Sequence, residues 1–481
     1  MNTKMVRYIL CRMLGVEAAL LLVPVLVAVI YQEKCGIVFL IPIGILCLLF
    51  WVAGRKRPEH GQIYGKEGMV IVALAWILWS LFGAMPFTLS GYIPSYVDAF
   101  FETVSGFTTT GSSIIPDVEV LPHCLLFWRS FTHWIGGMGV LVFVLVVTSL
   151  DRKNSMYLMR AEVPGPEKDK LVPKAMSTAR ILYGMYLILT VIEMVFLVIG
   201  GMNLFDSMIF SFGSAGTGGF SNYADSVAHF NSAYIDGVIT VFCALFGVNF
   251  ALFYFMILGD FKSILKNEEL RTYILLIAGA TAAIVFNIHS LYPTIGKSFR
   301  YAIFQVVTVI TTTGYSTADF AQWPMFSKAV IMMLTVVGAC ASSTGGGIKV
   351  SRLLVGMKCV KREIVQLAHP KSVGIIRIGG KKVSSDVLRT IYIYFIAYVG
   401  ILIGSVLLVS LDNFDFETTF SAVLTTLGNV GPGMAKVGPM GNFAEFSPLS
   451  KLILCFDMLA GRLEIFPFLV LFTAPAWRRK F

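Results

Sequence analysis

Four short strings rich in glycine and threonine interrupt an otherwise apolar sequence. They read SGFTTTGSS, GSAGTGGFS, TVITTTGYS and TTLGNVGPG. They align, at intervals of about one hundred residues, on Gly111, Gly219, Gly314 and Gly431. Glycine allows backbone dihedrals that turn successive carbonyl groups to one side, and a threonine hydroxyl adds a further oxygen. Because rings of carbonyl oxygens replace the hydration shell of a monovalent cation, the pattern predicts a cation-selective filter.

A short apolar segment precedes each string, and longer apolar runs flank each of these units. The short segments have about twelve residues, too few to cross a bilayer core of about 30 Å, so we expect re-entrant pore helices. Non-helical backbone at membrane depth is tolerated only where it is buried in protein or lines a water-filled cavity. Four strings that face one another satisfy this condition. The alternative is a secondary transporter, whose glycine-rich turns and broken helices also bind ions.

The composition excludes a water-soluble protein. Of 481 residues, 56% are hydrophobic and 14% are charged, against about 25% charged in an average soluble domain. Apolar runs of spanning length occur about ten times, near residues 9–31, 37–54, 68–92, 124–150, 181–201, 235–258, 272–291, 327–355, 388–411 and 449–474. We therefore expect an all-α polytopic membrane protein. Its four tandem helix, pore-loop, helix repeats would have pseudo-fourfold symmetry around a central pore, and two N-terminal transmembrane helices would precede them.

The repeat spacing divides the chain into five units. They are an N-terminal two-helix extension (1–64), pore repeat 1 (65–155), pore repeat 2 (156–260), pore repeat 3 with a broken last helix and a gating loop (261–365), and a cytoplasmic linker with pore repeat 4 (366–481).

The basic residues indicate the orientation. The net charge is +10, and most Lys and Arg lie between spans, on one side of the membrane if the spans alternate. The positive-inside rule places these segments and both termini in the cytoplasm, and this distribution does not favour nucleic-acid binding. The opposite face carries Asp98, Asp117, Glu119, Asp206, Asp225, Asp412, Asp415 and Glu417. An acidic mouth would concentrate cations, although aspartates at helix starts are an equally good interpretation.

Other chemistry finds little support. The eight cysteines are scattered without a Cys-x-x-Cys pair, so neither a disulfide framework nor a zinc site is expected. His133 beside Trp134 is interpreted as a packed residue. The sequence contains neither HEXXH nor Gly-x-Ser-x-Gly, so an enzyme is not expected. No organic cofactor is expected, and a cation would be the substrate.

These features resemble the Trk/Ktr/HKT superfamily of potassium uptake proteins, most closely its bacterial TrkH/TrkG group. The resemblance covers the whole chain. It includes the four strings and the segments that follow them, RSFTHWIGGMGV, GVNFALF, GACASSTGGGIKVSR and MLAGRLEIFPFLVL. The two N-terminal spans also resemble the TrkH/TrkG group, because Ktr-type subunits are shorter.

The resemblance implies that main-chain oxygens of each string hold potassium. The residues at the matching positions are Thr109, Thr110 and Gly111; Thr217, Gly218 and Gly219; Thr312, Thr313 and Gly314; and Asn429, Val430 and Gly431. Glycine in all four strings goes with potassium preference in this superfamily, whereas a serine in the first admits sodium. The chain departs from the pattern in the fourth string, and only the third string keeps a Gly-Tyr pair.

The run near 327–355 contains small polar residues that would break a helix. The resemblance implies that this segment is an intramembrane gate under the filter, whereas the simpler interpretation is a flexible kink. The gate residues are Gly338, Ser342, Ser343, Thr344, Gly345, Gly346, Gly347 and Lys349. Arg462 lies inside the last span, where a charge is costly. By resemblance it faces the pore and holds the gate; the alternative is a structural salt bridge with Asp457 or Glu193.

The basic stretch 349–389 is too long for a turn and too polar to insert. It could bind anionic lipid headgroups. The resemblance instead implies docking of a cytosolic ring of TrkA-type nucleotide-binding subunits, a homodimer, and a location in the bacterial cytoplasmic (inner) membrane. A proton- or sodium-coupled potassium symporter is the alternative function. It would need an ionisable relay, for which Glu193, Asp457 and Glu464 are the obvious candidates.

Overall fold

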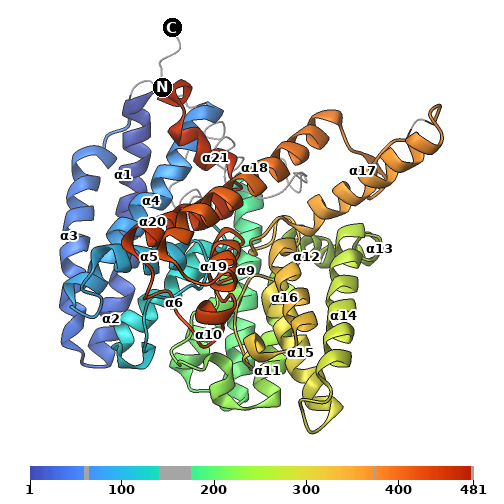
Figure 1. Cartoon of the computed structure of the whole chain (residues 1–481). Helices are drawn as coiled ribbons and strands as arrows, with labels where there is room; N and C mark the ends of the chain where they lie inside the picture. Colours follow the sequence, from blue (N-terminus) through green and yellow to red (C-terminus); the bar gives the residue numbers. More distant parts are fainter. Residues whose placement is uncertain (59–63, 140–174, 373, 478–481) are drawn as a thin grey trace.

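The computed structural model describes residues 1–58, 64–139, 175–372 and 374–477. Within these residues the fold is helical apart from one hairpin, in which β1 (Arg377–Ile378) pairs antiparallel with β2 (Lys381–Lys382). Figure 1 shows the helices as one assembly, with the N-terminal helices on the left and the third repeat on the right. The expectation of an all-α membrane protein is confirmed, because a small hairpin outside the spans does not change the class.

The N-terminal extension consists of two hairpinned spans. Its elements are α1 (Thr3–Leu20), α2 (Leu22–Ile30), the 3₁₀ helix η1 (Lys34–Phe39), α3 (Leu40–Leu49) and the π-helical turn η2 (Phe50–Gly54). α1 packs against α4, and α2 packs against α6. The extension therefore packs against the first repeat from the outside, and many of its Leu, Ile and Val side chains are exposed on its outer surface.

Four groups of helices follow. The first comprises α4 (Gly65–Leu89), α5 (Tyr96–Phe107), η3 (Val118–Val120) and α6 (His123–Gly137). The second comprises α9 (Ala175–Ile199), α10 (Leu204–Gly216), η4 (Ser226–Phe230), α11 (Ala233–Phe246) and α12 (Phe250–Ile257). The third comprises α13 (Phe261–Leu265), α14 (Glu268–Ile288), α15 (Ile295–Ile310), η5 (Phe320–Gln322), α16 (Met325–Val337) and α17 (Val350–Ala368).

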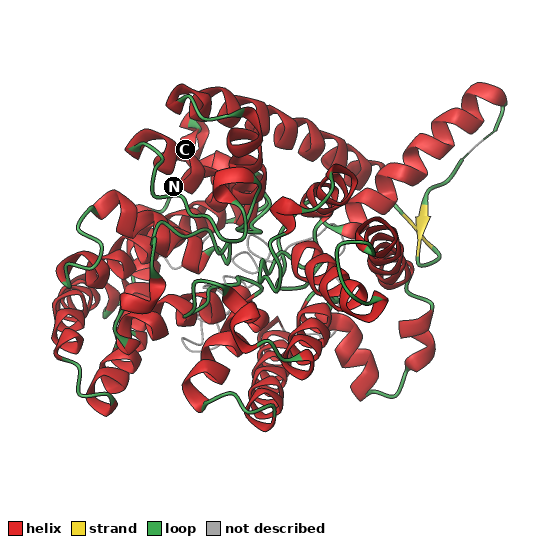
Figure 2. Cartoon of the chain, turned by 60° about the horizontal axis from the view of Figure 1, so that its bottom comes forward, coloured by secondary structure: helices red, strands yellow, loops and turns green. Residues whose placement is uncertain are grey.

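The fourth group begins after the hairpin. It comprises α18 (Ser385–Val409), η6 (Ser410–Asp412), α19 (Phe416–Leu427), η7 (Ala435–Val437), α20 (Pro448–Arg462), α21 (Phe466–Leu469), η8 (Val470–Phe472) and α22 (Ala474–Trp477). α20 packs against α5, so the last group returns to the first. Figure 2 shows the result, in which loops from all sides meet in the middle of a ring of helices.

Fewer continuous spans exist than the ten apolar runs suggest. In the described residues, six helices are long and apolar enough to cross a membrane: Thr3–Ile30, Lys34–Gly54, Gly65–Leu89, Ile181–Ile199, Glu268–Ile288 and Ser385–Asp412. α11 and α12 form a seventh span if their 93° bend is counted within one span. The run near 327–355 is broken, as expected from its small polar residues. The run near 449–474 is also not one continuous helix, and there the expectation of a full span is wrong. The second half of the run 124–150 lies outside the described residues.

The helix after each string is short. α6, α11, α16 and α20 have 15, 14, 13 and 15 residues. At 1.5 Å per residue, such a helix reaches about 22 Å, less than a bilayer core of about 30 Å. From the sequence, a break was expected only in the third repeat. Breaks after α11 and α20 were missed, because hydropathy alone does not register a glycine or a left-handed residue inside an apolar run.

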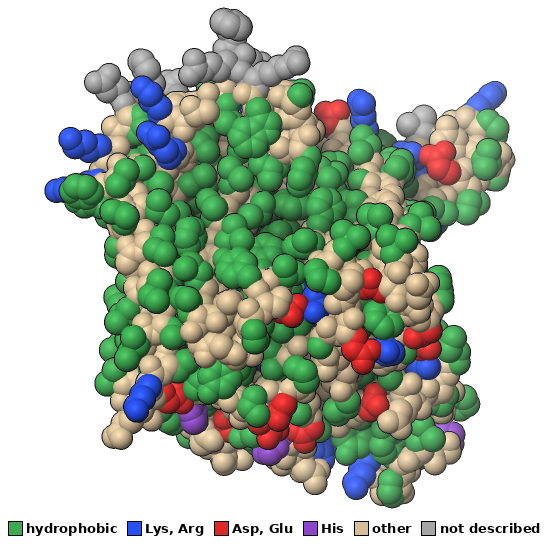
Figure 3. Space-filling view, turned by 60° about the vertical axis from the view of Figure 1, so that its left-hand side comes forward, with side chains coloured by type: hydrophobic (Ala, Val, Ile, Leu, Met, Phe, Trp, Pro, Cys, Tyr) green, Lys and Arg blue, Asp and Glu red, His purple; other side chains and the backbone are tan. Residues whose placement is uncertain are grey.

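The surface has the banding of a membrane protein. In Figure 3 hydrophobic side chains cover much of the upper and middle part of the molecule, and most of the visible Asp and Glu lie in the lower half, whereas Lys and Arg are visible both at the upper rim and in the lower half. α1 starts at the upper end, where α21 also lies (Figure 1). The orientation expected from the positive-inside rule stays a prediction.

Candidate functional site

The four pore helices α5, α10, α15 and α19 begin in the same way. In each, the N-cap side chain accepts a hydrogen bond from the backbone N–H three residues later, the caps being Ser95, Asn203, Thr294 and Asp415. Hydrogen bonds from the Thr418 side chain and backbone hold the pKa of Asp415 below its usual value. Asp415, one of the acidic residues expected on this face, thus serves as a helix cap.

All four pore helices also end alike. The residue two before each aligned glycine has a left-handed backbone, with φ of 53° at Thr109, 56° at Thr217, 60° at Thr312 and 54° at Asn429. The next backbone N–H donates to the carbonyl five residues earlier, at 2.9 Å for Thr110, 2.8 Å for Gly218, 2.7 Å for Thr313 and 2.9 Å for Val430. This is a Schellman turn with threonine or asparagine where glycine is usual. The repetition in backbone geometry is stronger than the repetition in sequence.

The aligned glycines close a ring. Their φ values are 82° at Gly111, 76° at Gly219, 81° at Gly314 and 96° at Gly431, which disfavours any other residue. A Cβ added to each aligned glycine would overlap a carbonyl oxygen of the next string, that of the residue just before its aligned glycine. The glycine and the residue whose oxygen it would overlap are Gly111 and Gly218, Gly219 and Thr313, Gly314 and Val430, and Gly431 and Thr110. The contacts pass once through all four strings and return to the first, so the strings surround one axis.

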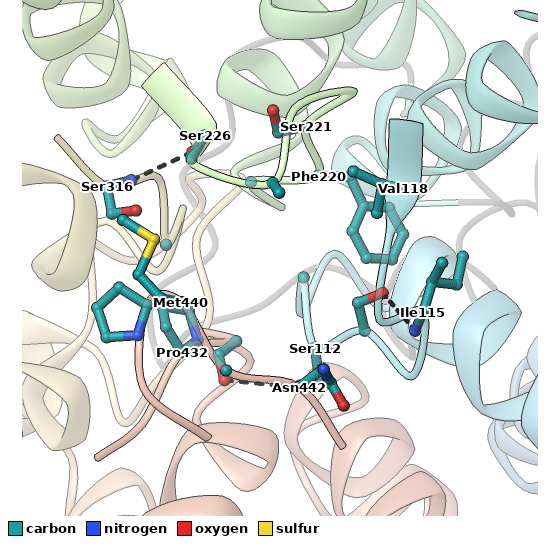
Figure 4. A pocket seen from close by; sticks show the side chains of 18 of the residues that line it. Ser112, Ile115, Val118, Phe220, Ser221, Ser226, Ser316, Pro432, Met440 and Asn442 are labelled. Carbon is teal, nitrogen blue, oxygen red and sulfur yellow. Dashed lines mark hydrogen bonds between the residues drawn. The ribbon is translucent and has the colours of Figure 1, made fainter. Parts of the chain in front are cut away.

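One cavity opens on this ring. It has a volume of about 130 Å³, and all four aligned glycines line it. Figure 4 shows the side chains around it, with Ser112, Phe220, Ser316 and Pro432 contributed by the four different strings or the residues directly after them. None of the described residues that line it is an Asp or a Glu. The oxygens at the ring are therefore main-chain carbonyls and hydroxyls, which suit a monovalent cation.

The pore helices add a favourable field. α5, α10, α15 and α19 end at Phe107, Gly216, Ile310 and Leu427, directly before the strings. The carboxyl end of a helix carries a partial negative charge of about half an elementary charge. Four such ends at the ring give a negative potential that favours a cation there without a fixed acidic side chain.

Two charged residues beside the ring were missed in the sequence analysis, and one of them, Arg129, lines the cavity. Arg129 Nε donates to Glu102 Oε1 at 2.6 Å, and both side chains are buried. Glu102 also accepts from the backbone N–H of Ile114 at 2.9 Å. Arg129 donates to the Ser221 carbonyl at 2.8 Å and lies over the Phe220 ring. The pair fastens the first string to the second. The sequence does show a Glu and an Arg inside otherwise apolar segments, and this pattern could have indicated a buried ion pair.

His133 lies behind the same two strings. It is fully buried, its ring stacks on Phe220, and its Nδ1 lies 2.7 Å from the Gly106 carbonyl. A Cβ at Gly218 would overlap the imidazole ring. His133 is therefore a packed residue, as expected.

Below the ring, a loop of residues 338–349 separates α16 from α17. Its backbone is left-handed at Gly338, Ser342, Gly347 and Lys349, with φ of 71°, 56°, 74° and 83°. Such dihedrals are unfavourable for Ser and Lys. Contacts with the surrounding protein must therefore hold the loop in place.

The loop packs directly beneath the third and fourth strings. The backbone N–H of Gly346 donates to Thr312 Oγ1 at 2.6 Å. A Cβ at Gly345 would lie 2.8 Å from the Thr311 carbonyl oxygen, and one at Gly346 would lie 2.6 Å from that of Gly428. No side chain fits between the loop and the ends of these pore helices. The loop therefore lies on the side of the ring opposite the cavity.

Hydrogen bonds join the same loop to the break between α11 and α12. Thr344 Oγ1 donates to the Phe246 carbonyl at 3.2 Å, and the Phe250 N–H donates to the Ser342 carbonyl at 3.1 Å. Within the loop, Ser343 Oγ donates to the Cys340 carbonyl at 2.7 Å. The loop is thus a specific, hydrogen-bonded structure rather than a flexible kink.

Arg462, at the end of α20, lies against the loop. Its NH1 donates to the Thr344 carbonyl at 2.7 Å, and its NH2 donates to the Gly137 carbonyl at 2.8 Å and to that of Gly136. Asp457 instead accepts a hydrogen bond from Ser405. Arg462 therefore contacts carbonyl groups, and among the described residues the structure does not show the salt bridge with Asp457 that was the alternative interpretation. Arg462 ties the loop to the end of α6.

Two further charges hold the loop. Lys349 is buried, and its ammonium donates to the Gly345 carbonyl within the loop. Glu269, near the start of α14, was missed in the sequence analysis. Its Oε1 accepts from the N–H of Ala341 at 2.7 Å and from that of Ser351 at 3.1 Å, one inside the loop and one just after it. Glu269 therefore fixes the loop at Ala341 and fixes the start of α17 at Ser351. It is distant from both in sequence, and the fold brings it to the loop.

The sequence and structure match known proteins over the whole chain. The family model TrkH, described as a cation transport protein, matches residues 39–477. The Trk system potassium uptake protein TrkH of Salmonella typhimurium is 36% identical over 467 residues, covering 95% of this chain and 96% of the relative. The Trk system potassium uptake protein TrkG of Escherichia coli is 33% identical, covering 99% and 100%. The crystal structure of the potassium transporter TrkH from Vibrio parahaemolyticus matches with a TM-score of 0.89 and 31% identity, covering 99% and 100%.

Proposed function

Because the chain belongs to the TrkH family of cation transport proteins, we propose that it takes up potassium through a channel-like pore. It is an integral membrane transport protein and not an enzyme. The observation that carries the proposal is the closed ring of Gly111, Gly219, Gly314 and Gly431 around one cavity. Potassium, as substrate, exchanges part of its hydration shell for main-chain oxygens of the twelve filter residues given above.

The loop of residues 338–349 is proposed to be the gate. It lies beneath the third and fourth strings, in contact with Thr312. An ion that leaves the ring toward this side meets the loop and the guanidinium of Arg462. A fixed positive charge opposes the passage of a cation. The pore therefore conducts only when the loop and Arg462 separate, which requires breaking the contacts that Glu269, Arg462 and Lys349 make.

A coupled symporter finds less support. Glu193 and Asp457 are buried, but neither lines the cavity at the ring. Glu464 pairs with Arg352. A proton or sodium relay needs ionisable groups along the ion path. The three carboxylates named from the sequence do not form such a path within the described residues.

We place the protein in the bacterial cytoplasmic membrane, with the gate loop toward the cytoplasm. The relatives named above are subunits of a Trk system. A cytosolic TrkA-type nucleotide-binding ring is the proposed partner, and α17 and the hairpin of β1 and β2 offer basic residues on the gate side for its docking. Assembly as a homodimer and contact with lipid remain part of the same proposal.

Flux through purified protein in liposomes tests this function. Potassium, rubidium, sodium and lithium are compared under an imposed voltage. We expect uptake of potassium and rubidium that follows the voltage and the potassium gradient alone. Obligatory movement of protons or sodium with potassium would favour the symporter, and equal flux of all four ions would contradict a carbonyl-lined filter.

A further inference from the structure

The cavity that opens on the glycine ring, here called the outer cavity, has a positive charge in its wall. Arg129 is the one charged side chain among the described residues that line it. Its side chain is only 4% exposed, so the guanidinium is part of the cavity wall and not a flexible surface group. A fixed positive charge beside the path of a cation opposes that cation. The position of Arg129 therefore has a consequence for which ions enter.

Arg129 is held in one orientation. Its Nε donates to Glu102 Oε1 at 2.6 Å, and its NH1 donates to the Ser221 carbonyl at 2.8 Å. The guanidinium carbon lies 3.6 Å from the centroid of the Phe220 ring. Phe220 and Ser221 themselves line the outer cavity (Figure 4). The positive charge is therefore fixed beside the residues that directly follow the second filter string.

Glu102 lies behind Arg129, away from the outer cavity. It does not line the cavity, and its side chain has no exposed surface. Its carboxylate also accepts from the backbone N–H of Ile114 at 2.9 Å and from the Ser113 hydroxyl at 3.0 Å. The ion pair thus has its positive end at the cavity and its negative end inside the protein. Pairing makes a buried guanidinium tolerable and reduces its field at the cavity without cancelling it.

Carbonyl oxygens by themselves do not exclude divalent cations. Calcium binds oxygen ligands that include backbone carbonyl groups, so a ring of carbonyls would also hold calcium and be blocked by it. The energy of an ion in an electrostatic potential is proportional to the charge of the ion. A positive potential that lowers the occupancy of potassium by some factor therefore lowers that of calcium by the square of this factor.

We propose that the pair of Arg129 and Glu102 gives the pore its selectivity for monovalent over divalent cations. The guanidinium keeps divalent cations from the carbonyl ring, and Glu102 sets the strength of this exclusion by balancing part of the charge. The inference rests on the proposed transport function and adds to it a discrimination by charge. A pair that only supports the fold would give the same defect when either partner is lost, whereas this role requires opposite effects.

The test is rubidium uptake by the full-length protein in liposomes. Calcium chloride is present at equal concentration on both sides, so the orientation of the protein does not matter, and choline chloride keeps the ionic strength constant. Two quantities are measured, the KM for rubidium and the calcium concentration that halves the uptake. We expect Arg129→Gln to lower the KM about threefold and the half-inhibiting calcium concentration about tenfold, because the second factor is the square of the first.

The other variants separate charge from structure. Glu102→Gln leaves the guanidinium unbalanced, so both quantities should rise. Arg129→Lys keeps the positive charge and should retain the calcium tolerance of the wild type. Arg300→Gln is the matched control, because Arg300 Nε pairs with the buried Asp236 at 2.7 Å but does not line the outer cavity. It should leave both quantities unchanged.

The proposal is overturned if Arg129→Gln and Glu102→Gln shift the half-inhibiting calcium concentration in the same direction or leave it unchanged. Should a single variant fail to fold, the double variant Arg129→Gln/Glu102→Gln keeps a hydrogen-bonding pair without charge. It is expected to be more sensitive to calcium than the wild type, and wild-type tolerance would overturn the proposal. Absence of rubidium uptake by the wild type would contradict the transport function itself, whereas a conducting wild type with unaltered variants would contradict only the selectivity by charge.

Discussion

Glu269 offers the sharpest perturbation of the gate. Its Oε1 accepts hydrogen bonds at 2.7 Å from Ala341 and at 3.1 Å from Ser351, and its side chain is 7% exposed. Glu269→Gln keeps an oxygen acceptor of the same length but removes the charge. Glu269→Ala removes the acceptor and leaves two backbone N–H groups without it. Glu269→Gln should therefore weaken the hydrogen bonds to Ala341 and Ser351, and Glu269→Ala should remove them.

The magnitude follows from the two hydrogen bonds. A hydrogen bond to a charged group contributes about 1.5–3 kcal/mol, and a neutral acceptor contributes about half as much. At the lower end of this range the two bonds together contribute about 3 kcal/mol, which Glu269→Ala should release from the closed state, and Glu269→Gln should release about half of it, about 1.5 kcal/mol. With 1.4 kcal/mol for each factor of ten, these energies correspond to open-to-closed ratios raised about tenfold and about a hundredfold.

The assay is the initial rate of rubidium uptake into liposomes without any added partner subunit. A mostly closed pore should gain about tenfold in flux in Glu269→Gln and more in Glu269→Ala. Glu268→Gln is the matched control, because Glu268 is the neighbouring residue but pairs with Lys358 outside the loop. Equal flux in the Glu269→Gln and Glu268→Gln proteins, with both folded, would refute the assignment of Glu269 to the gate.

Three further outcomes are expected. Gly219→Ala should abolish potassium flux into liposomes, because the added Cβ would overlap the Thr313 carbonyl oxygen. Gly237→Ala, whose added Cβ has nothing within 4 Å, should leave the flux unchanged. Arg462→Ala should raise rubidium leak at least tenfold while membrane insertion persists, because its hydrogen bonds to the Thr344 and Gly137 carbonyls, worth about 1.5–3 kcal/mol each, are lost. Unchanged uptake would count against a pore role for Arg462. Glu102→Gln should lower the Tm, because breaking a buried ion pair costs about 3–5 kcal/mol; an unaltered melting curve would show that the pair with Arg129 is not structural.

Much of the fold was predictable because hydropathy and backbone chemistry act locally. The N-terminal spans, the pore helices and the four strings follow from apolar runs and from glycines that need a positive φ, such as Gly111 and Gly431. The broken third repeat was visible in the cluster of Gly345, Gly346 and Gly347. The division into five units stays a prediction, because part of it depends on residues outside the described ranges.

The remaining features depend on contacts between distant residues. Glu269 reaches the loop across about seventy positions of sequence, and Glu102 and Arg129 join two strings, so their roles come from the fold and not from local pattern. Arg462 was identified as a gate residue by resemblance, but its partners are carbonyl groups, which no sequence pattern distinguishes. The break after α20 was missed because Glu464 and Ile465 have left-handed backbones although neither residue type favours one.

The central claim is that main-chain oxygens of four strings hold one dehydrated cation on their common axis. Crystals of the protein soaked in rubidium test it directly through anomalous scattering at the rubidium absorption edge. The account predicts an anomalous peak inside the ring of Gly111, Gly219, Gly314 and Gly431, within coordination distance of their carbonyl oxygens. An occupied rubidium site elsewhere in the molecule, with none on this axis, would contradict it.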